Sequence, residues 1–208
     1  MRVLMALVLA AVAARAADPA PLDAWLRHQA SIRSLEAEFV QERRLPSLKQ
    51  PVTTPGRVLL RRPGCLRWEL GQPPATVAVA DGTTLVLAEV AAKRARRIPA
   101  DSPEAQRFTL LAGERFHDPA AFHRAFELHG SRTAGAFYQA TLRPTDRRLR
   151  AQVPWLFLTI SPADNRLHSF ELELRDGSRI RSTFLRPRFN RALPDERFRL
   201  DLTGYRVR

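Results

Sequence analysis

Residues 57–82 read RVLLRRPGCLRWELGQPPATVAVADG, and this stretch sets the expected fold. Three short apolar segments, 57–61, 65–70 and 75–80, are separated by Pro-Gly and Gly-Gln-Pro-Pro, which favour turns. Asp81-Gly82 then leads into a fourth apolar segment, 83–90. An Asp-Gly pair between two apolar runs is a strong signal for a β-hairpin. The stretch therefore predicts four consecutive antiparallel strands.

The sequence before this stretch predicts one helix and one strand. Residues 20–33 carry apolar side chains at roughly helical spacing, and Asp18 or Pro21 suits the helix start. From residue 35 onward apolar and acidic residues alternate, which is typical of a strand with one buried face. Residues 46–55 contain three prolines, so we expect a loop there.

The sequence after this stretch begins with a break in the strand pattern. We expect residues 93–97, KRARR, to form a charged loop, and residues 103–112 and 118–127 to form helices. Asp118-Pro119 resembles an N-cap followed by proline at the first helical position. His129-Gly130-Ser131 is expected to form a turn. Strands then resume at 136–142, 155–160, 166–174, 179–185 and 197–201, with a second Asp-Gly hairpin at Asp176-Gly177.

These consecutive short strands favour an antiparallel meander. Residues 155–160 are apolar on both faces, which indicates that part of the sheet is covered on both sides. The three helical segments can supply that cover. The chain is therefore expected to be mainly β, with helices against one face of the sheet.

The N-terminus has the pattern of an export signal. Arg2 precedes a twelve-residue apolar run, 3–14, and Ala14-Arg15-Ala16 has the A-x-A form of a cleavage site. Twelve apolar residues are too few to cross ~30 Å of hydrocarbon. We therefore interpret residues 1–16 as a signal peptide and residues 17–208 as a single exported domain.

The composition narrows the possible partners. The formal net charge is +13, and nearly all of the basic residues are arginine. This charge indicates either a solvated basic outer face or attraction to anionic lipid headgroups or acidic proteins. Nucleic acid is disfavoured, because the chain has no nucleic-acid motif and the export signal takes it elsewhere. Cys65 is the single cysteine, so no internal disulfide or cysteine-rich metal site can form.

No pattern in the sequence points to catalysis. The five histidines form no HxxxH or HExxH arrangement, and no GxSxG nucleophile elbow is present. Carboxylates such as Glu36 and Glu171 alternate with apolar residues, which places them on an exposed strand face. A catalytic carboxylate pair whose members lie far apart in the chain is the alternative that sequence leaves open. We therefore expect no enzyme activity, no metal and no cofactor.

Several ordered motifs resemble those of the outer-membrane lipoprotein carrier (LolA) family. The resemblance spans nearly the whole mature chain and is most specific over residues 34–90. The matching motifs are Phe39-x-Gln41, Arg61-Arg62-Pro63 followed by Trp68, Gln72-Pro73, Val79-x-Asp81-Gly82-x-x-Leu85 and Phe108-Thr109-Leu110-Leu111. The departures are a Leu85-Val86-Leu87-Ala88 run where classical carriers are aromatic, a short C-terminus and the strongly basic charge.

The resemblance implies an incomplete, strongly curved antiparallel β-barrel with a helical lid over its mouth. It implies a periplasmic, monomeric carrier that shields lipoprotein acyl chains between an inner-membrane ABC-type exporter and an outer-membrane acceptor. In that family the arginine at the position of Arg62 hydrogen-bonds the lid and holds the empty cavity closed. The departures leave two alternatives open: a carrier for another lipid or lipid-linked product such as a glycolipid or pigment, or a lipid-sensing regulatory module of the envelope.

Strand alternation then gives an expected set of cavity residues, because every second side chain of a strand faces the same side. We expect one concave face to carry Phe39, Val58, Leu60, Leu66, Trp68, Val77, Val79, Leu85, Phe170 and Leu172. Phe108 and Leu111 are expected to face them from the lid. Sequence alone does not separate a lined cavity from a filled core, and it is the resemblance that favours the cavity.

Overall fold

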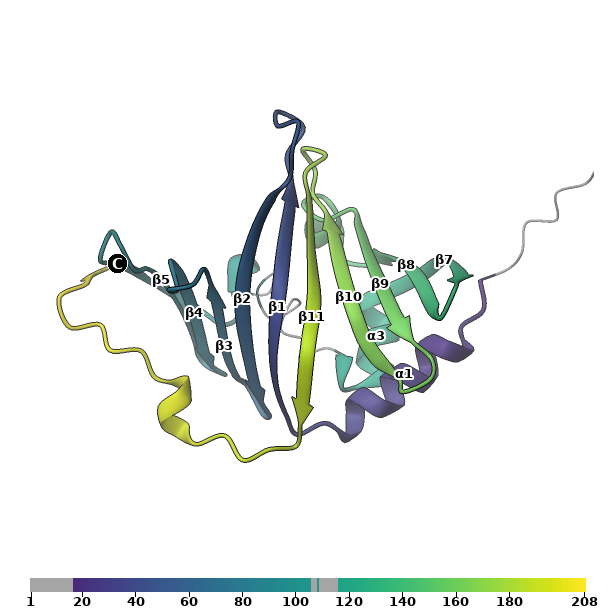
Figure 1. Ribbon diagram of the computed structural model, residues 1–208, viewed down its shortest axis with the longest axis horizontal. Coiled ribbons are helices and arrows are strands. Elements are labelled where there is room, and N and C mark those ends of the chain that lie inside the picture. Colours follow the sequence, from purple (N-terminus) through teal and green to yellow (C-terminus); the bar gives the residue numbers. More distant parts are fainter. Residues whose placement is uncertain (1–16, 106–107, 109–115) are drawn as a thin grey trace, which may run out of the picture.

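The computed structural model describes residues 17–105, 108 and 116–208. Its centre is one twelve-stranded sheet that curves strongly without closing into a barrel, with helices along its concave side (Figure 1). This architecture confirms the expected fold class. The proposed signal peptide, residues 1–16, and most of the expected helix at 103–112 lie outside the described residues.

The strands and helices are joined mostly by short connections. The strands are β1 (Ser34–Arg44), β2 (Val52–Arg61), β3 (Cys65–Leu70), β4 (Thr76–Asp81), β5 (Thr84–Glu89), β6 (Arg94–Pro99), β7 (Phe126–Ala134), β8 (Phe137–Pro144), β9 (Trp155–Ser161), β10 (Arg166–Glu173), β11 (Arg179–Phe189) and β12 (Arg206–Val207). The helices are α1 (Ala20–Ser31), α3 (Pro119–Ala125), α4 (Arg147–Arg150) and the 3-10 helix η2 (Asp195–Phe198).

The sheet consists of two meanders that meet at its centre. Strands β2 to β6 follow β1 in order toward one edge, and β10 to β7 follow β11 in reverse order toward the other. At the junction, Phe39 of β1 lies opposite Gly56 of β2 on one side and Phe184 of β11 on the other. The meander predicted from the sequence is thus interrupted between β6 and β7, which lie toward opposite edges, and the pairing of β11 with β1 joins its two parts.

Two aspartates hold a turn and a helix start through hydrogen bonds from the backbone, as the sequence predicts. Asp81-Gly82 joins β4 to β5, with Gly82 at a φ of 92° and the Asp81 carboxylate accepting the Thr83 and Thr84 N–H groups, each at 2.9 Å. These hydrogen bonds favour the ionised form and hold the pKa of Asp81 below its ordinary value. Asp118 caps α3 by accepting the Ala121 N–H at 3.0 Å. The predicted hairpin and the predicted N-cap are both confirmed.

Two expectations about charged and polar segments were wrong. Residues 94–99 form strand β6 rather than a loop, because Ala95 and Ile98 are buried while the arginines between them face solvent. His129-Gly130-Ser131 lies inside β7, where a bulge between Leu128 and Gly130 takes the place of the expected turn.

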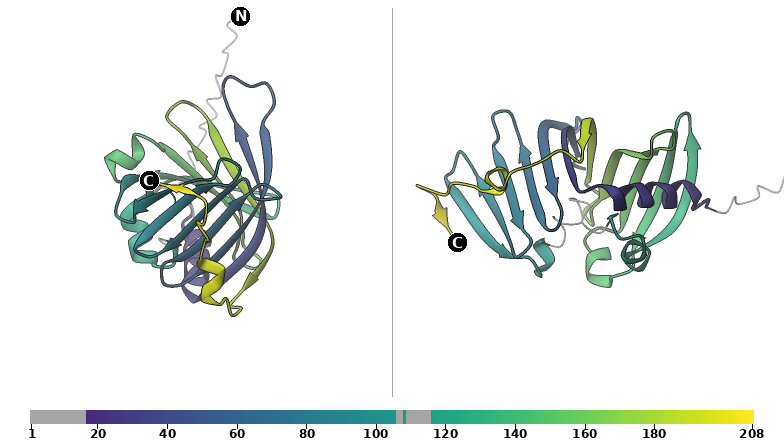
Figure 2. Two further views of the ribbon diagram at one scale, coloured as in Figure 1. Left: turned by 90° about the vertical axis from the view of Figure 1, so that its left-hand side faces the viewer. Right: turned by 90° about the horizontal axis from the view of Figure 1, so that it is seen from below.

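The C-terminal segment, residues 190–208, crosses the convex face instead of adding the strand expected at 197–201 (Figure 2, left). Leu193 and Phe198 pack there on a small apolar cluster that includes Leu59. The last residues form β12, which pairs in parallel with β6. The C-terminal segment therefore buries an apolar patch on the convex face of this half of the sheet.

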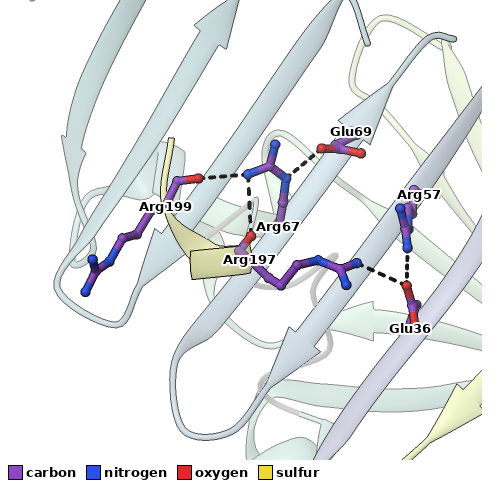
Figure 3. A network of polar contacts seen from close by, with 6 residues as sticks. All are labelled: Glu36, Arg57, Arg67, Glu69, Arg197 and Arg199. Carbon is purple, nitrogen blue, oxygen red and sulfur yellow. Dashed lines mark hydrogen bonds and ion pairs between the residues drawn. The ribbon is translucent and has the colours of Figure 1, made fainter. Parts of the chain in front are cut away.

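Arginines hold the C-terminal segment in place (Figure 3). Arg67 of β3 donates to the main-chain oxygens of Arg199 and Arg197, at 2.9 and 3.4 Å. The Arg197 side chain reaches the Glu36 carboxylate of β1 at 3.2 Å, and Arg57 pairs with the same carboxylate. Part of the arginine content thus holds the C-terminal segment on the sheet.

Candidate functional site

A row of aromatic side chains crosses the centre of the concave face. Phe39, Trp68, Phe170 and Phe184 come from β1, β3, β10 and β11. The ring centroids lie 4.1 Å apart for Phe39 and Trp68, and 5.8 Å apart for Phe170 and Phe184. Gly56 on the intervening strand β2 makes the first contact possible, because a Cβ at that position would overlap the Phe39 ring. This row forms the floor of the site.

Helix α1 lies along the concave side of the β8–β10 half of the sheet (Figure 2, right). Leu22, Trp25 and Leu26 occupy positions i, i+3 and i+4 of the helix and are fully buried. Trp25 packs on Phe116 and Phe122, with ring centroids 5.3 and 6.2 Å apart. The side chains of α1 and α3 thus fill the space above the β7–β10 strands.

The start of α1 is tied to the sheet and to α3. The Tyr138 hydroxyl of β8 donates to the main-chain oxygen of Asp18 at 2.5 Å. Burial disfavours the phenolate and raises the pKa of Tyr138. His123 of α3 lies 2.9 Å from the Asp23 carboxylate.

The end of α1 is held by Arg62, which directly follows β2. Arg62 Nη1 donates to the main-chain oxygens of Gln29 at 2.6 Å and Ile32 at 2.7 Å. These carbonyls belong to the C-terminal end of the helix, where the backbone dipole favours a cation. Arg62 thus contacts the end of α1, whereas the lid that the resemblance implied, residues 108–111, lies outside the described residues except for Phe108.

A small apolar cavity lies beside this contact. Its volume is about 50 Å³, whereas pockets for small molecules commonly measure roughly 300–1,000 Å³. Arg62 and Gln29 form its polar side, and the remaining lining residues are Leu35, Ala37, Val58, Leu60, Trp68, Phe116, Leu167, Phe184, Pro187 and Phe189. Among the described residues, only a small space is left at this point between α1 and the centre of the sheet.

The structure brings most of the expected cavity residues to one face. Val58, Leu60 and Trp68 line the small cavity. The main apolar cluster on the same face contains Phe39, Leu66, Leu85, Phe170 and Leu172, and Phe108 packs against it. Leu111 lies outside the described residues.

Val77 and Val79 lie on the opposite face, contrary to the expectation. Val79 pairs with Arg67 in the β3–β4 register, and both valines pack with Leu193 and Phe198 under the C-terminal segment. Ala78 and Ala80 take the concave positions instead. Both faces of β4 are buried, so apolar alternation carried no information about which side faces inward.

Sequence reasoning missed several residues that complete the site. Phe184 was left out, although alternation along Ile180, Ser182 and Phe184 could have placed it inside. Phe122 was identified as part of a helix but not as part of the site, and Phe116 lies in a connection where no periodicity marks it.

The described residues show little else that could do chemistry. No three His, Cys, Asp or Glu side chains gather there as metal ligands would. None of the helices in the same part of the chain has the length and apolar character that crossing a bilayer requires. The site therefore consists of an apolar face, a helical cover and one arginine that joins them.

Comparisons with known proteins support this architecture. The family model described as outer membrane lipoprotein carrier protein LolA matches residues 30–201. A search of curated proteins found no match. An uncharacterised conserved protein from Thermus thermophilus has a similar structure, with a TM-score of 0.54 and 12% identity, over 91% of this chain and 98% of that one.

Two further solved structures are similar at low identity. A DUF1329 family protein from Desulfovibrio piger ATCC 29098 gives a TM-score of 0.50 at 11% identity, over 86% of this chain and 96% of that one. A LolA superfamily protein from Nitrosomonas europaea gives 0.44 at 12% identity, over 86% and 97%. At such identities, the likenesses to the Thermus thermophilus and Desulfovibrio piger proteins concern the fold alone.

Proposed function

This chain belongs to the outer membrane lipoprotein carrier (LolA) family, and from that premise we propose that it carries lipoprotein acyl chains through the periplasm. The observation that supports the proposal most is the apolar concave face together with a helix, α1, that Arg62 anchors beside it. The small cavity of about 50 Å³ marks where the packing between cover and sheet is incomplete. An acyl chain entering there would replace the side chains of the cover as the apolar partner of the sheet.

The energetics favour such an exchange. Each CH₂ group buried from water contributes ~0.8 kcal/mol, so one acyl chain can offset the loss of many side-chain contacts. Trp25, Phe116 and Phe122 would move away together with α1 and α3, because their rings contact one another. The sheet itself would keep its hydrogen-bonded ladder throughout.

Arg62 is proposed as the lock of this cover. Its two hydrogen bonds to Gln29 and Ile32 form only while α1 lies against the sheet. The proposed lipid contacts are Phe39, Val58, Leu60, Leu66, Trp68, Leu85, Phe170 and Leu172, with Phe108 and Leu111 on the lid side. Val77 and Val79 are not among them, because they face away.

The proposed role includes specific partners and a place in the cell. The chain would act as a non-enzymatic monomer in the periplasm, receive cargo from an inner-membrane ABC-type exporter and pass it to an outer-membrane acceptor. A carrier for another lipid is the second candidate, because aliphatic Leu85-Val86-Leu87-Ala88 replaces the aromatic run of the classical carriers.

Mass spectrometry of the lipids that co-purify with the periplasmic protein tests the proposal. We expect acylated peptides from lipoproteins, whereas a glycolipid or another free lipid would support the second candidate. A preparation without any lipid that also fails to bind a fluorescent fatty acid would contradict both.

A matched pair of variants locates the binding site. Ala37→Val fills part of the small cavity, and we expect it to weaken binding of the fluorescent fatty acid. Ala95→Val is the control, because Ala95 is also 2% exposed but lies on β6, away from the cavity. Equal binding by the two variants, at equal stability, would contradict a site at the cavity.

A further inference from the structure

Three connections meet at the end of the sheet that lies opposite Arg62. They are the β1–β2 turn, the β10–β11 turn and the segment that contains α4. Arg44 of β1 lies opposite Arg179 of β11 in the strand register. The Arg175 N–H donates to the Gln152 oxygen at 3.1 Å. Figure 1 shows the two hairpins projecting side by side beyond the rest of the sheet. We call residues 42–52, 146–151 and 173–179 the hairpin end.

The hairpin end is strongly basic. It contains eight arginine and lysine residues and four carboxylates, a net charge of +4. Arg44 pairs with Glu42, and Arg179 pairs with Glu173. Arg43 lies close enough to Asp176 to favour its ionised form. Within the described part of the chain, no ion pair forms at the exposed side chains of Lys49, Arg147, Arg148 and Arg175. Four cations at one end of the molecule are therefore available to an anionic partner.

Two apolar side chains are exposed at the end of the longer hairpin, one in the turn and one at the start of β2. Leu48 is 48% exposed and Val52 is 46% exposed, whereas most large apolar side chains of the described residues are buried. A hydrogen bond from the Leu48 N–H to the Leu45 oxygen at 3.0 Å closes a turn there. Two exposed aliphatic side chains thus project from the molecule, next to the unpaired cations.

We propose that the hairpin end docks on the surface of an anionic phospholipid bilayer. Leu48 and Val52 enter the boundary between headgroups and acyl chains, while the surrounding arginines and Lys49 lie at the level of the phosphates. A projecting hairpin with exposed aliphatic side chains surrounded by cations is suited to the headgroup region of an anionic bilayer. An acidic protein would have to provide a pocket for the tip, so we favour lipid.

This surface lies at the other end of β1 from Arg62 and the end of α1. Eleven residues of strand extend roughly 35 Å. Docking at the hairpin end leaves α1 and Arg62 free to move. The inference therefore holds whether or not the chain carries acyl chains.

Vesicle flotation of the purified protein tests this inference. We expect binding to vesicles of phosphatidylglycerol and phosphatidylethanolamine, none to phosphatidylcholine vesicles, and loss of binding as salt is raised. Leu48→Ser should weaken binding about tenfold. Lys49→Gln should weaken binding about fivefold, because one lysine or arginine near an anionic lipid surface changes the affinity by about that factor.

Leu185→Ser is the matched control. Leu185 is 40% exposed but lies on β11, and its replacement should leave vesicle binding unchanged. An equal loss in Leu48→Ser and Leu185→Ser would contradict the proposal, as would a parent protein that ignores anionic vesicles or binds only acidic proteins. Fatty-acid binding measured in parallel keeps the two proposals distinct, because Leu48→Ser should not change it.

Discussion

Replacing Arg62 with leucine removes the contact that joins the sheet to the end of α1. Two hydrogen bonds are lost, to Gln29 at 2.6 Å and to Ile32 at 2.7 Å. The Gln29 oxygen keeps a partner, because it also accepts the Ile32 N–H at 3.2 Å. The net loss is then close to that of one charge-assisted hydrogen bond, about 2 kcal/mol.

A loss of about 2 kcal/mol shifts the balance between closed and open cover about thirtyfold. If the open form is the minor one that accepts ligand, the apparent affinity for a fatty acid rises by up to the same factor. The free energy of unfolding falls by no more than about 2 kcal/mol, because the open form retains the whole sheet.

Two measurements check this prediction. Titration with a fluorescent fatty acid should show tighter binding by Arg62→Leu, and amide hydrogen exchange along α1 should become faster while exchange in β1 and β2 stays unchanged. Arg33→Leu is the control, because Arg33 is also close to the end of α1 but its side chain is exposed. Unchanged affinity and unchanged exchange in Arg62→Leu would refute the role of Arg62 as a lock.

Three other substitutions test the packing and the charges. Trp25→Ala should lower the free energy of unfolding by about 3–5 kcal/mol in urea titrations, because Trp25 is fully buried between α1 and α3. Phe198→Ala should cost about 3 kcal/mol on the convex face and leave fatty-acid affinity unchanged; a weakened affinity would link the two faces. The pKa of Glu36 is lowered, chiefly by the hydrogen bond from Arg57. The ionised form therefore stabilises the fold above the unfolded-state pKa, and this contribution is lost as the pH falls through the folded-state pKa. Glu36→Gln should flatten the loss of stability below about pH 4, and an unaltered pH profile would contradict this reasoning.

Local chemistry explains the parts of the fold that the sequence predicted well. Asp81-Gly82 and Asp118-Pro119 satisfy their own backbone hydrogen bonds, so the neighbouring chain hardly alters their effect. Alternation along residues 35–39 likewise identified the buried face of β1, because its other face carries glutamates. Alternation of apolar and polar residues predicts the buried face wherever the other face of the strand is exposed to water.

Tertiary contacts decide the parts that sequence reasoning missed. In β4 both faces are buried, one by the concave core and one by the C-terminal segment, so Val77 and Val79 were placed on the wrong face. In β6 the run of arginines suggested a loop, although charged residues are common on edge-proximal strands. Phe116 joins the site only because α1 packs over it. None of these contacts is encoded in local periodicity.

The pairing of β1 with β11 also constrains the order of folding. Gln41 and Ser182 meet across this junction although they are 141 positions apart in the chain. The hairpins of each meander can form from neighbouring residues, but the centre of the sheet must wait until nearly the whole chain is available. Closing so long a loop is entropically costly, and the two half-sheets would expose their apolar faces until it closes. A nascent chain would therefore stay incompletely folded until β11 emerged.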